Sequence, residues 1–136
     1  MADPIDALIE RLREARKGSR ELDCAIFCST AESPFENYYP NCILASLGGF
    51  SARVEISEIP KFTTSLDAAT ELCERLLVGW HWSIRKKSTD PDFFEGMVTQ
   101  AAWSYAADRF KASHDCGPIA LTLAVLLAKQ EIAAHD

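Results

Sequence analysis

The chain has 136 residues, of which 48% are apolar and 25% are charged, a balance typical of one soluble globular domain. Its formal charge of −6 argues against non-specific binding to duplex DNA, which requires a basic face that neutralises phosphates. No apolar run reaches the ~20 residues of a membrane-spanning helix, and no basic segment followed by an apolar one opens the chain as a secretory signal would.

The first half of the chain predicts two short helices and then a hairpin. Asp3-Pro4 is a helix start, and Ile5, Leu8, Ile9 and Leu12 form one apolar stripe after it. The last turn of this helix is expected to hold Arg13, Arg16 and Lys17, and Gly18 is expected to end it. Ser19 is expected to cap a second helix that ends near Ser29.

Between this helix pair and the next helix, residues 30–41 are predicted to form an irregular loop, because they contain two prolines and two asparagines. Residues 43–47 and 50–59 are expected to pair as a hairpin around Gly48-Gly49. Thr64 is predicted to cap a helix over residues 66–77, with Asp67 reaching back to it and Gly79 ending it.

The second half of the chain contains the clearest strand. In residues 80–85, Trp80, Trp82 and Ile84 alternate with polar side chains. Residues 101–112 fit a helix by their alanines and a strand by their aromatic residues, and we predict a strand that is the antiparallel neighbour of residues 80–85. A last helix begins at Asp115-Cys116-Gly117-Pro118 and is apolar almost all round, so it is expected to lie centrally. The order of elements predicts a single α+β domain over residues 1–136, with an antiparallel sheet covered by helices.

The cysteines and histidines do not predict a metal site or a cofactor. Five cysteines without an export signal indicate reduced thiols in a cytosolic compartment. Cys24 and Cys28 share a helix face, and no second pair stands at zinc spacing. Cys116 and His114 are the one local pair of nucleophile and base, but residues two apart in an extended segment do not face each other. We therefore expect no catalytic residues and no enzymatic activity.

A ligand site is expected on the polar face of the best strand. His81, Ser83 and Arg85 alternate with the tryptophans and are predicted to line a concave site. Arg85 and Arg109, on the neighbouring strand, carry guanidinium groups that bind phosphate in a bidentate manner. In the alternative, the tryptophans belong to the core and the arginines lie on a rim.

Two further features belong to this predicted ligand site. Tyr38 and Tyr39 lie in the proline-bounded loop and are expected to stack on a nucleotide base. Alternatively, they only seal the loop. His114, beside the start of the last helix, is predicted as a second anion-binding residue.

Three segments of the chain carry a family resemblance. They are Leu8-Ile9-Glu10-Arg11-Leu12 with Arg20-Glu21-Leu22-Asp23, then Phe62-Thr63-Thr64-Ser65-Leu66-Asp67-Ala68-Ala69 with Gly79-Trp80-His81-Trp82, and finally Gly117-Pro118-Ile119-Ala120-Leu121. In this order they resemble the phage ABA sandwich domain proteins, which phages and prophages encode. The resemblance implies an α-β-α sandwich, here with about four strands, and it implies no catalytic residue. The Cys-Gly-Pro start of the last helix and residues 32–47 depart from the family pattern.

From the resemblance we expect a non-catalytic phage accessory protein in the cytoplasm of the bacterial host. Its expected role is to bind and sequester a (cyclic) nucleotide defence signal, as a homo-oligomer, and so to block anti-phage immunity. Surplus aromatic residues such as Phe93, Phe94, Trp103 and Tyr105 support association. The alternatives are an acidic, anti-CRISPR-like inhibitor of a host defence complex, acting through residues 32–36, 55–58 and 90–95, and a virion or assembly protein whose last helix packs against a copy.

Overall fold

The structure is a computed structural model that describes residues 5–31, 35–47, 50–86, 93–100 and 109–134. Within these ranges the chain forms, in order, α1 (Ile5–Glu14), α2 (Arg20–Thr30), β1 (Phe35–Tyr38), β2 (Cys42–Leu47), β3 (Phe50–Val54), the 3₁₀ turn η1 (Ile56–Glu58), α3 (Leu66–Leu76), β4 (His81–Lys86), β5 (Phe94–Thr99), β6 (Arg109–His114) and α4 (Gly117–Ala134). The predicted α+β class is confirmed.

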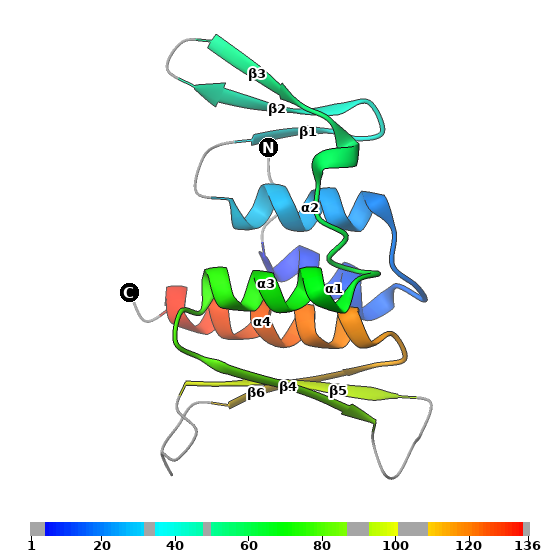
Figure 1. The fold of residues 1–136 in the computed structure, drawn as a ribbon, viewed down its shortest axis with the longest axis vertical. Coiled ribbons are helices and arrows are strands. Elements are labelled where there is room, and N and C mark those ends of the chain that lie inside the picture. The colour runs from blue at the N-terminus through cyan, green and yellow to red at the C-terminus, as the bar shows by residue number, and fades with distance from the viewer. Residues whose placement is uncertain (1–4, 32–34, 48–49, 87–92, 101–108, 135–136) are drawn as a thin grey trace.

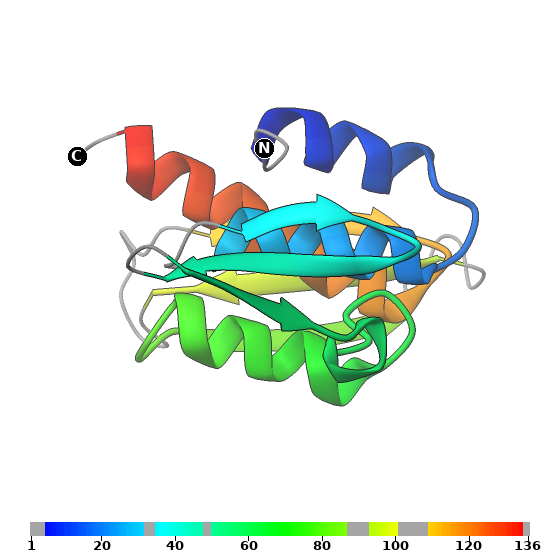
Figure 2. The ribbon, with the colours of Figure 1, turned by 90° about the horizontal axis from the view of Figure 1, so that it is seen from above.

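The elements stack in layers (Figure 1). The sheet β1-β2-β3 lies at one end, α2 lies next to it, the layer of α1, α3 and α4 follows, and the sheet β4-β5-β6 forms the other end. Seen from above, α1 and α3 flank this stack on opposite sides (Figure 2). The described helices therefore lie between two three-stranded antiparallel sheets. This differs from the predicted sandwich, in which helices enclose one sheet of about four strands.

Helix α4 is the centre of the core. Every residue from Ile119 to Leu126 is buried, and the helix packs against β5, β6, α3 and α1. An apolar surface on all sides of a helix requires neighbours on all sides, so the predicted central position is confirmed. Despite its composition, neither α4 nor any other helix of the described ranges is long and apolar enough to cross a membrane.

The helix starts follow the capping rules, with two corrections. Ser19 Oγ accepts a hydrogen bond from the Leu22 amide at 3.1 Å, as predicted. Helix α3 is capped by Ser65, whose Oγ accepts from the Ala68 amide at 3.3 Å, and not by Thr64. Helix α1 ends at Glu14, so the predicted basic last turn is wrong in part, because Arg16 and Lys17 follow the helix instead of ending it. The Asp3-Pro4 start lies outside the described residues.

A buried carboxylate joins α2 to the segment that precedes α3. Asp23 is fully buried, and its Oδ1 accepts hydrogen bonds from the amide of Thr63 at 2.9 Å and from its hydroxyl at 2.7 Å. Its Oδ2 lies 2.8 Å from Nη1 of Arg20, which also donates from Nη2 to the carbonyls of Ile56 and Ile59. Since each group of this network has a partner, the burial of the charge is compensated.

The first sheet contains one strand that the sequence did not predict. The expected hairpin is confirmed by the pairing of β2 with β3, in which Leu47 opposes Phe50, while Gly48-Gly49 lies outside the described residues. Its second arm ends at Val54, earlier than predicted. The predicted irregular loop is wrong over Phe35–Tyr38, which pairs with β2 as β1. Packing of Phe35 against Phe27 of α2, at 4.9 Å between ring centroids, accounts for this strand.

The order of strands in the second sheet differs from the predicted order. The strand β4 is confirmed, but its antiparallel partner is β5, and β6 pairs with the other side of β5. The part of the predicted strand over residues 101–108 lies outside the described residues. Gly96 on β5 allows the sheet to contact α4 closely, because a Cβ there would lie 2.6 Å from the Ala120 carbonyl oxygen.

Candidate functional site

The alternation along β4 separates a core face from an exposed face. Ile84 packs against the helical core, and Trp82, on the same face of this edge strand, is 40% exposed. His81, Ser83 and Arg85 lie on the opposite face, and all three are exposed. Since α4 packs on the core face of the sheet, these polar side chains are not covered by any described helix.

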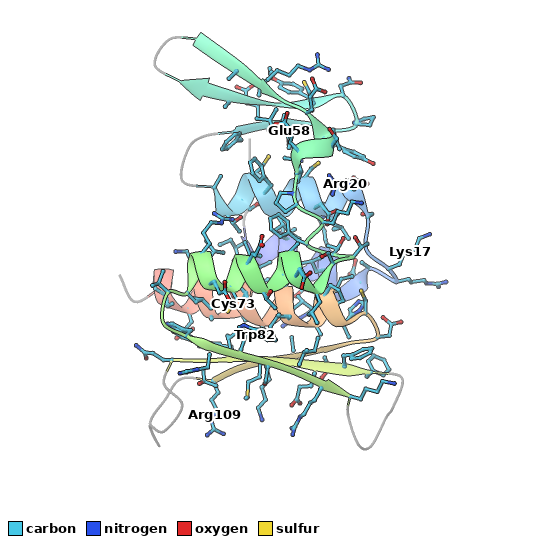
Figure 3. All side chains as sticks on the ribbon, viewed as in Figure 1. Lys17, Arg20, Glu58, Cys73, Trp82 and Arg109 are labelled. Carbon is cyan, nitrogen blue, oxygen red and sulfur yellow. The ribbon has the colours of Figure 1, made fainter. Side chains whose placement is uncertain are left out.

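Strand β5 carries this exposed face across to β6. His81 is opposite Thr99, which in turn is opposite Arg109, and Arg85 is opposite Glu95. Figure 3 shows Arg109 pointing away from the helices. We name this surface the open sheet face, and its residues are His81, Ser83, Arg85, Glu95, Met97, Arg109, Lys111 and Ser113, with the buried Thr99 at the same level of β5 as His81 and Arg109. The structure thus brings Arg85 and Arg109 onto one surface with His81 and Ser83, as predicted.

The open sheet face carries more positive than negative charge. Arg85 donates to Oε1 of Glu95 from Nη2 at 2.9 Å and from Nε at 3.2 Å. The Arg85 side chain is 72% exposed and Glu95 only 15% exposed, so Glu95 anchors the guanidinium while leaving much of it to solvent. Arg109 and Lys111 are exposed, and neither has an ion-pair partner among the residues that the structure describes.

Lys111 is a site residue that the sequence reasoning missed. It lies two residues from Arg109 on β6, so the two side chains leave the same face about 7 Å apart along the strand. The signal was present in the sequence, because Arg109, Lys111 and Ser113 alternate with Phe110 and Ala112. The predicted strand over residues 101–112 already contained Lys111 on the same face as Arg109, so this alternation alone was enough to include Lys111 in the site.

Tyr38 and Tyr39 do not belong to this surface. They lie at the end of β1 and in the turn that follows, in the sheet at the other end of the molecule (Figure 1). Both are exposed. The Tyr38 hydroxyl donates to the carboxylate of Glu36, and this hydrogen bond raises the pKa of Tyr38. The structure therefore does not place the two tyrosines with the arginines in one ligand site.

His114 has a structural role. It is 5% exposed, and its Nε2 lies 2.7 Å from the carbonyl oxygen of Ala15, while Nδ1 accepts from the Cys116 amide at 2.9 Å. The tautomer with hydrogen on Nε2 satisfies both contacts. Asp115 Oδ1 lies 2.9 Å from the same Nδ1, a contact that is an ion pair only when the ring carries both hydrogens. Because both ring nitrogens already contact the protein, the prediction of His114 as an anion-binding residue is corrected, and His114 is removed from the candidate site.

The thiols give no sign of a reactive centre. Cys116 Sγ donates to the carbonyl of Thr63 at 3.3 Å, and His114 contacts the Cys116 amide, not its thiol. Burial raises the pKa of Cys24, and it raises the pKa of Cys73 to about 11, so both thiols are held in their protonated form. Over the described ranges, no cluster of His, Cys, Asp and Glu is suited to hold a metal ion.

The candidate site is therefore an exposed, positively charged strand surface. The predicted concave site differs from this surface, on which His81, Ser83, Arg85, Arg109 and Lys111 are all exposed to solvent. Comparison with known proteins adds no assignment: no family model matches the chain, and neither the curated proteins nor the solved structures contain a significant match. The resemblance to phage ABA sandwich domain proteins stays a prediction.

Proposed function

We propose that the protein is a non-catalytic binding protein that takes a phosphate-bearing nucleotide on the open sheet face. One observation carries this proposal. In a chain of formal charge −6, Arg109 and Lys111 stand exposed on one strand, and no acidic partner for them lies among the described residues. Two neighbouring cations on one face of a sheet attract an anion with two charged groups or one phosphate.

The neighbouring side chains suit a nucleotide better than a simple anion. A guanidinium binds phosphate through two parallel N–H donors, and Glu95 holds the Arg85 guanidinium in place over the sheet. Ser83 and Ser113 add hydroxyl donors on the same face, and Met97 at its middle is an apolar, polarizable contact for a base. The net charge of the chain argues against duplex DNA as the ligand.

Because the site is exposed, its affinity for a nucleotide is limited. Retention of the nucleotide therefore needs a further contribution. Charge pairs in contact with solvent are screened and contribute little each. Sequestration of a nucleotide signal by a homo-oligomer, in which a second copy covers the ligand, would overcome this limit. Under the phage resemblance, such sequestration in the bacterial host would keep a defence signal from its receptor.

Isothermal titration calorimetry with a panel of cyclic and linear nucleotides tests this proposal. We expect the double variant Arg109→Ala/Lys111→Ala to weaken binding by up to about tenfold, because two solvent-exposed charge contacts of up to about 1 kcal/mol each are lost. The matched control is Arg53→Ala, which removes an exposed arginine that pairs with Glu55 on the other sheet. The control should bind as the wild type does. No binding of any nucleotide by the wild type, or equal binding by the double variant, would contradict the proposal.

A second candidate function has an observation in its favour at the other end of the molecule. Glu36, Glu55 and Glu58 are exposed on and beside the first sheet, where Arg53 is the exposed cation of the described strands. Such an acidic surface fits a basic nucleic-acid channel of a host complex, which is the inhibitor hypothesis. A virion or assembly role has less support, since the apolar surface of α4 is buried within its own chain.

A further inference from the structure

A cavity of about 700 Å³ lies away from the open sheet face, where α2, α3 and α4 all end on the same side of the molecule (left in Figure 1). Its volume is in the range of pockets that bind small organic ligands. The side chains that characterise it are the apolar Ile5, Phe27, Phe35 and Leu76 and the basic Arg75 and Lys129.

The wall of this cavity has an apolar, aromatic part. Phe27 of α2 and Phe35 of β1 meet edge to face at 4.9 Å between ring centroids. Each of these residues is only partly buried, so each retains apolar surface for a ligand. Ile5 and Leu76, also partly buried, extend this surface from α1 and α3. Covering such apolar surface favours the binding of a ligand.

Among the described residues that line the cavity, the charged ones are Arg75 and Lys129, and none carries a carboxylate. Arg75 donates from Nη1 to the Thr30 carbonyl and from Nη2 to Thr30 Oγ1, both at 3.4 Å. These contacts are long for guanidinium hydrogen bonds, and among the described residues the other three of its five N–H donors have no hydrogen-bond acceptor. For Lys129, which is only partly exposed, no acidic partner lies among the described residues.

The partial negative charges at the helix C-termini offset only part of the positive charge of Arg75 and Lys129. The carbonyls at the end of α2 attract Arg75, and each helix C-terminus carries about half a negative charge that falls off within one turn. Two full positive charges beside an aromatic wall therefore favour an anion over a neutral ligand. The apolar residues favour a ligand whose remaining body is hydrophobic, and an aromatic body fits the Phe27–Phe35 pair.

We propose that this cavity binds a small organic anion with an aromatic body, with its carboxylate at Arg75 and Lys129 and its ring against Phe27 and Phe35. The proposal does not rest on the function proposed above, because none of these residues belongs to the open sheet face. Binding here would tie α1 and β1 to the ends of three helices, so the ligand would also stabilise the fold.

Titration of the full chain with naphthoate and with its neutral amide, naphthamide, separates the contribution of ligand charge to the affinity from that of ligand shape. We expect the wild type to bind naphthoate at least about tenfold more tightly than naphthamide, the ratio that one charge-assisted contact supplies. Lys129→Gln should reduce this ratio, and Arg75→Gln/Lys129→Gln should abolish it. The matched control, Lys111→Gln, removes a lysine of the open sheet face and should leave naphthoate binding unchanged.

Two results would overturn the proposal: equal affinity for naphthoate and naphthamide, or naphthoate binding that survives the double variant. Because Arg75 also contacts the end of α2, thermal unfolding of each variant shows whether it folds, and Lys129→Gln alone decides the matter if the Arg75 variant does not. Loss of naphthoate binding in Lys111→Gln would place the anion on the open sheet face instead, and nucleotide binding tested separately keeps the two proposals apart.

Discussion

Asp23 and His114 show how single buried polar residues fix the helices to their connecting segments. Asp23 accepts from both the amide and the hydroxyl of Thr63, and His114 joins the end of α1, through Ala15, to the start of α4, through Cys116. Both residues are at most 5% exposed. A buried polar group that lost these partners would cost its full desolvation energy, so these contacts specify the chain path between elements.

The thiol of Cys73 makes the stability of the fold depend on alkaline pH. Burial raises its pKa from 9.0 to about 11, with a smaller effect from Glu74. The folded protein therefore keeps a proton that the unfolded chain releases above pH 9.0. Stability from this residue is complete below that pH and is lost as the pH rises towards 11. We expect the free energy of unfolding to fall there by about 2 kcal/mol.

Urea unfolding at neutral pH and at pH of about 11 measures this loss. Cys73→Ala should remove this part of the pH dependence, although it lowers stability at all pH values by leaving a small cavity. Cys42→Ala, which removes a partly exposed thiol from β2, is the control. An identical alkaline decline in the wild type and Cys73→Ala would show that other groups cause it.

At the level of elements, Gly96 determines how closely the second sheet approaches α4. A Cβ at Gly96 would lie 2.6 Å from the Ala120 carbonyl oxygen and 2.7 Å from the Leu121 Cα, both backbone atoms that cannot rotate away. Gly96→Ala therefore forces β5 away from the central helix. We expect it to lower the free energy of unfolding by about 3 kcal/mol, at the upper end of the cost of overpacking.

A second glycine separates this packing effect from backbone strain. Gly79, in the turn before β4, has φ +83 and no atom within 4 Å of an added Cβ. Gly79→Ala should lower the free energy of unfolding by only about 1–2 kcal/mol, because alanine is strained in the left-handed backbone conformation. Chemical denaturation of Gly96→Ala and Gly79→Ala shows which substitution lowers the free energy of unfolding more. If Gly79→Ala were the more destabilising of the two, close approach to α4 would not be the main constraint on β5.

Gly96 also explains why the sequence predicted only part of the second sheet. A glycine inside Phe94–Thr99 lowers the strand signal of that segment, and only its contact with α4 shows why it is there. The alternation over residues 80–85, which depends on local pattern alone, predicted β4 and the face that His81, Ser83 and Arg85 share. By contrast, β1 depends on packing between Phe35 and Phe27, and no local pattern reports such a contact.

The residues of the candidate site likewise divide into those that the local sequence pattern placed correctly and those that it did not. His81, Ser83 and Arg85 follow from the alternation of one strand, so the sequence was sufficient to place them together. Placing Arg109 with them was correct, but the predicted direct pairing of the two strands was not, because β5 lies between them. The two tyrosines were misplaced because the sequence did not predict β1. Without that strand, the sequence does not show that their loop belongs to a separate sheet at the far end of the molecule.

Across the whole molecule, the described charges are unevenly distributed between the two sheets. Arg85, Lys86, Arg109 and Lys111 outnumber Glu95 on the strands of the second sheet, whereas Glu36, Glu55 and Glu58 outnumber Arg53 at the first. The four-layer stack holds these surfaces at opposite ends, with Glu58 at one end and Arg109 at the other in Figure 3. Since the Debye length is about 8 Å at physiological salt, the two ends act independently on charged ligands.

This independence allows one variant to separate the two candidate functions. Glu55→Lys/Glu58→Lys reverses the acidic end and should leave nucleotide affinity at the open sheet face within about twofold of wild type, because the charges are screened from it. Stability should change little, since the lost Arg53–Glu55 pair is exposed. If the protein instead inhibits a basic host complex through this end, the same variant loses inhibition in a nucleic-acid binding assay while Arg109→Ala/Lys111→Ala retains it. A fall in nucleotide affinity in the charge-reversed variant would contradict the separation of the two surfaces.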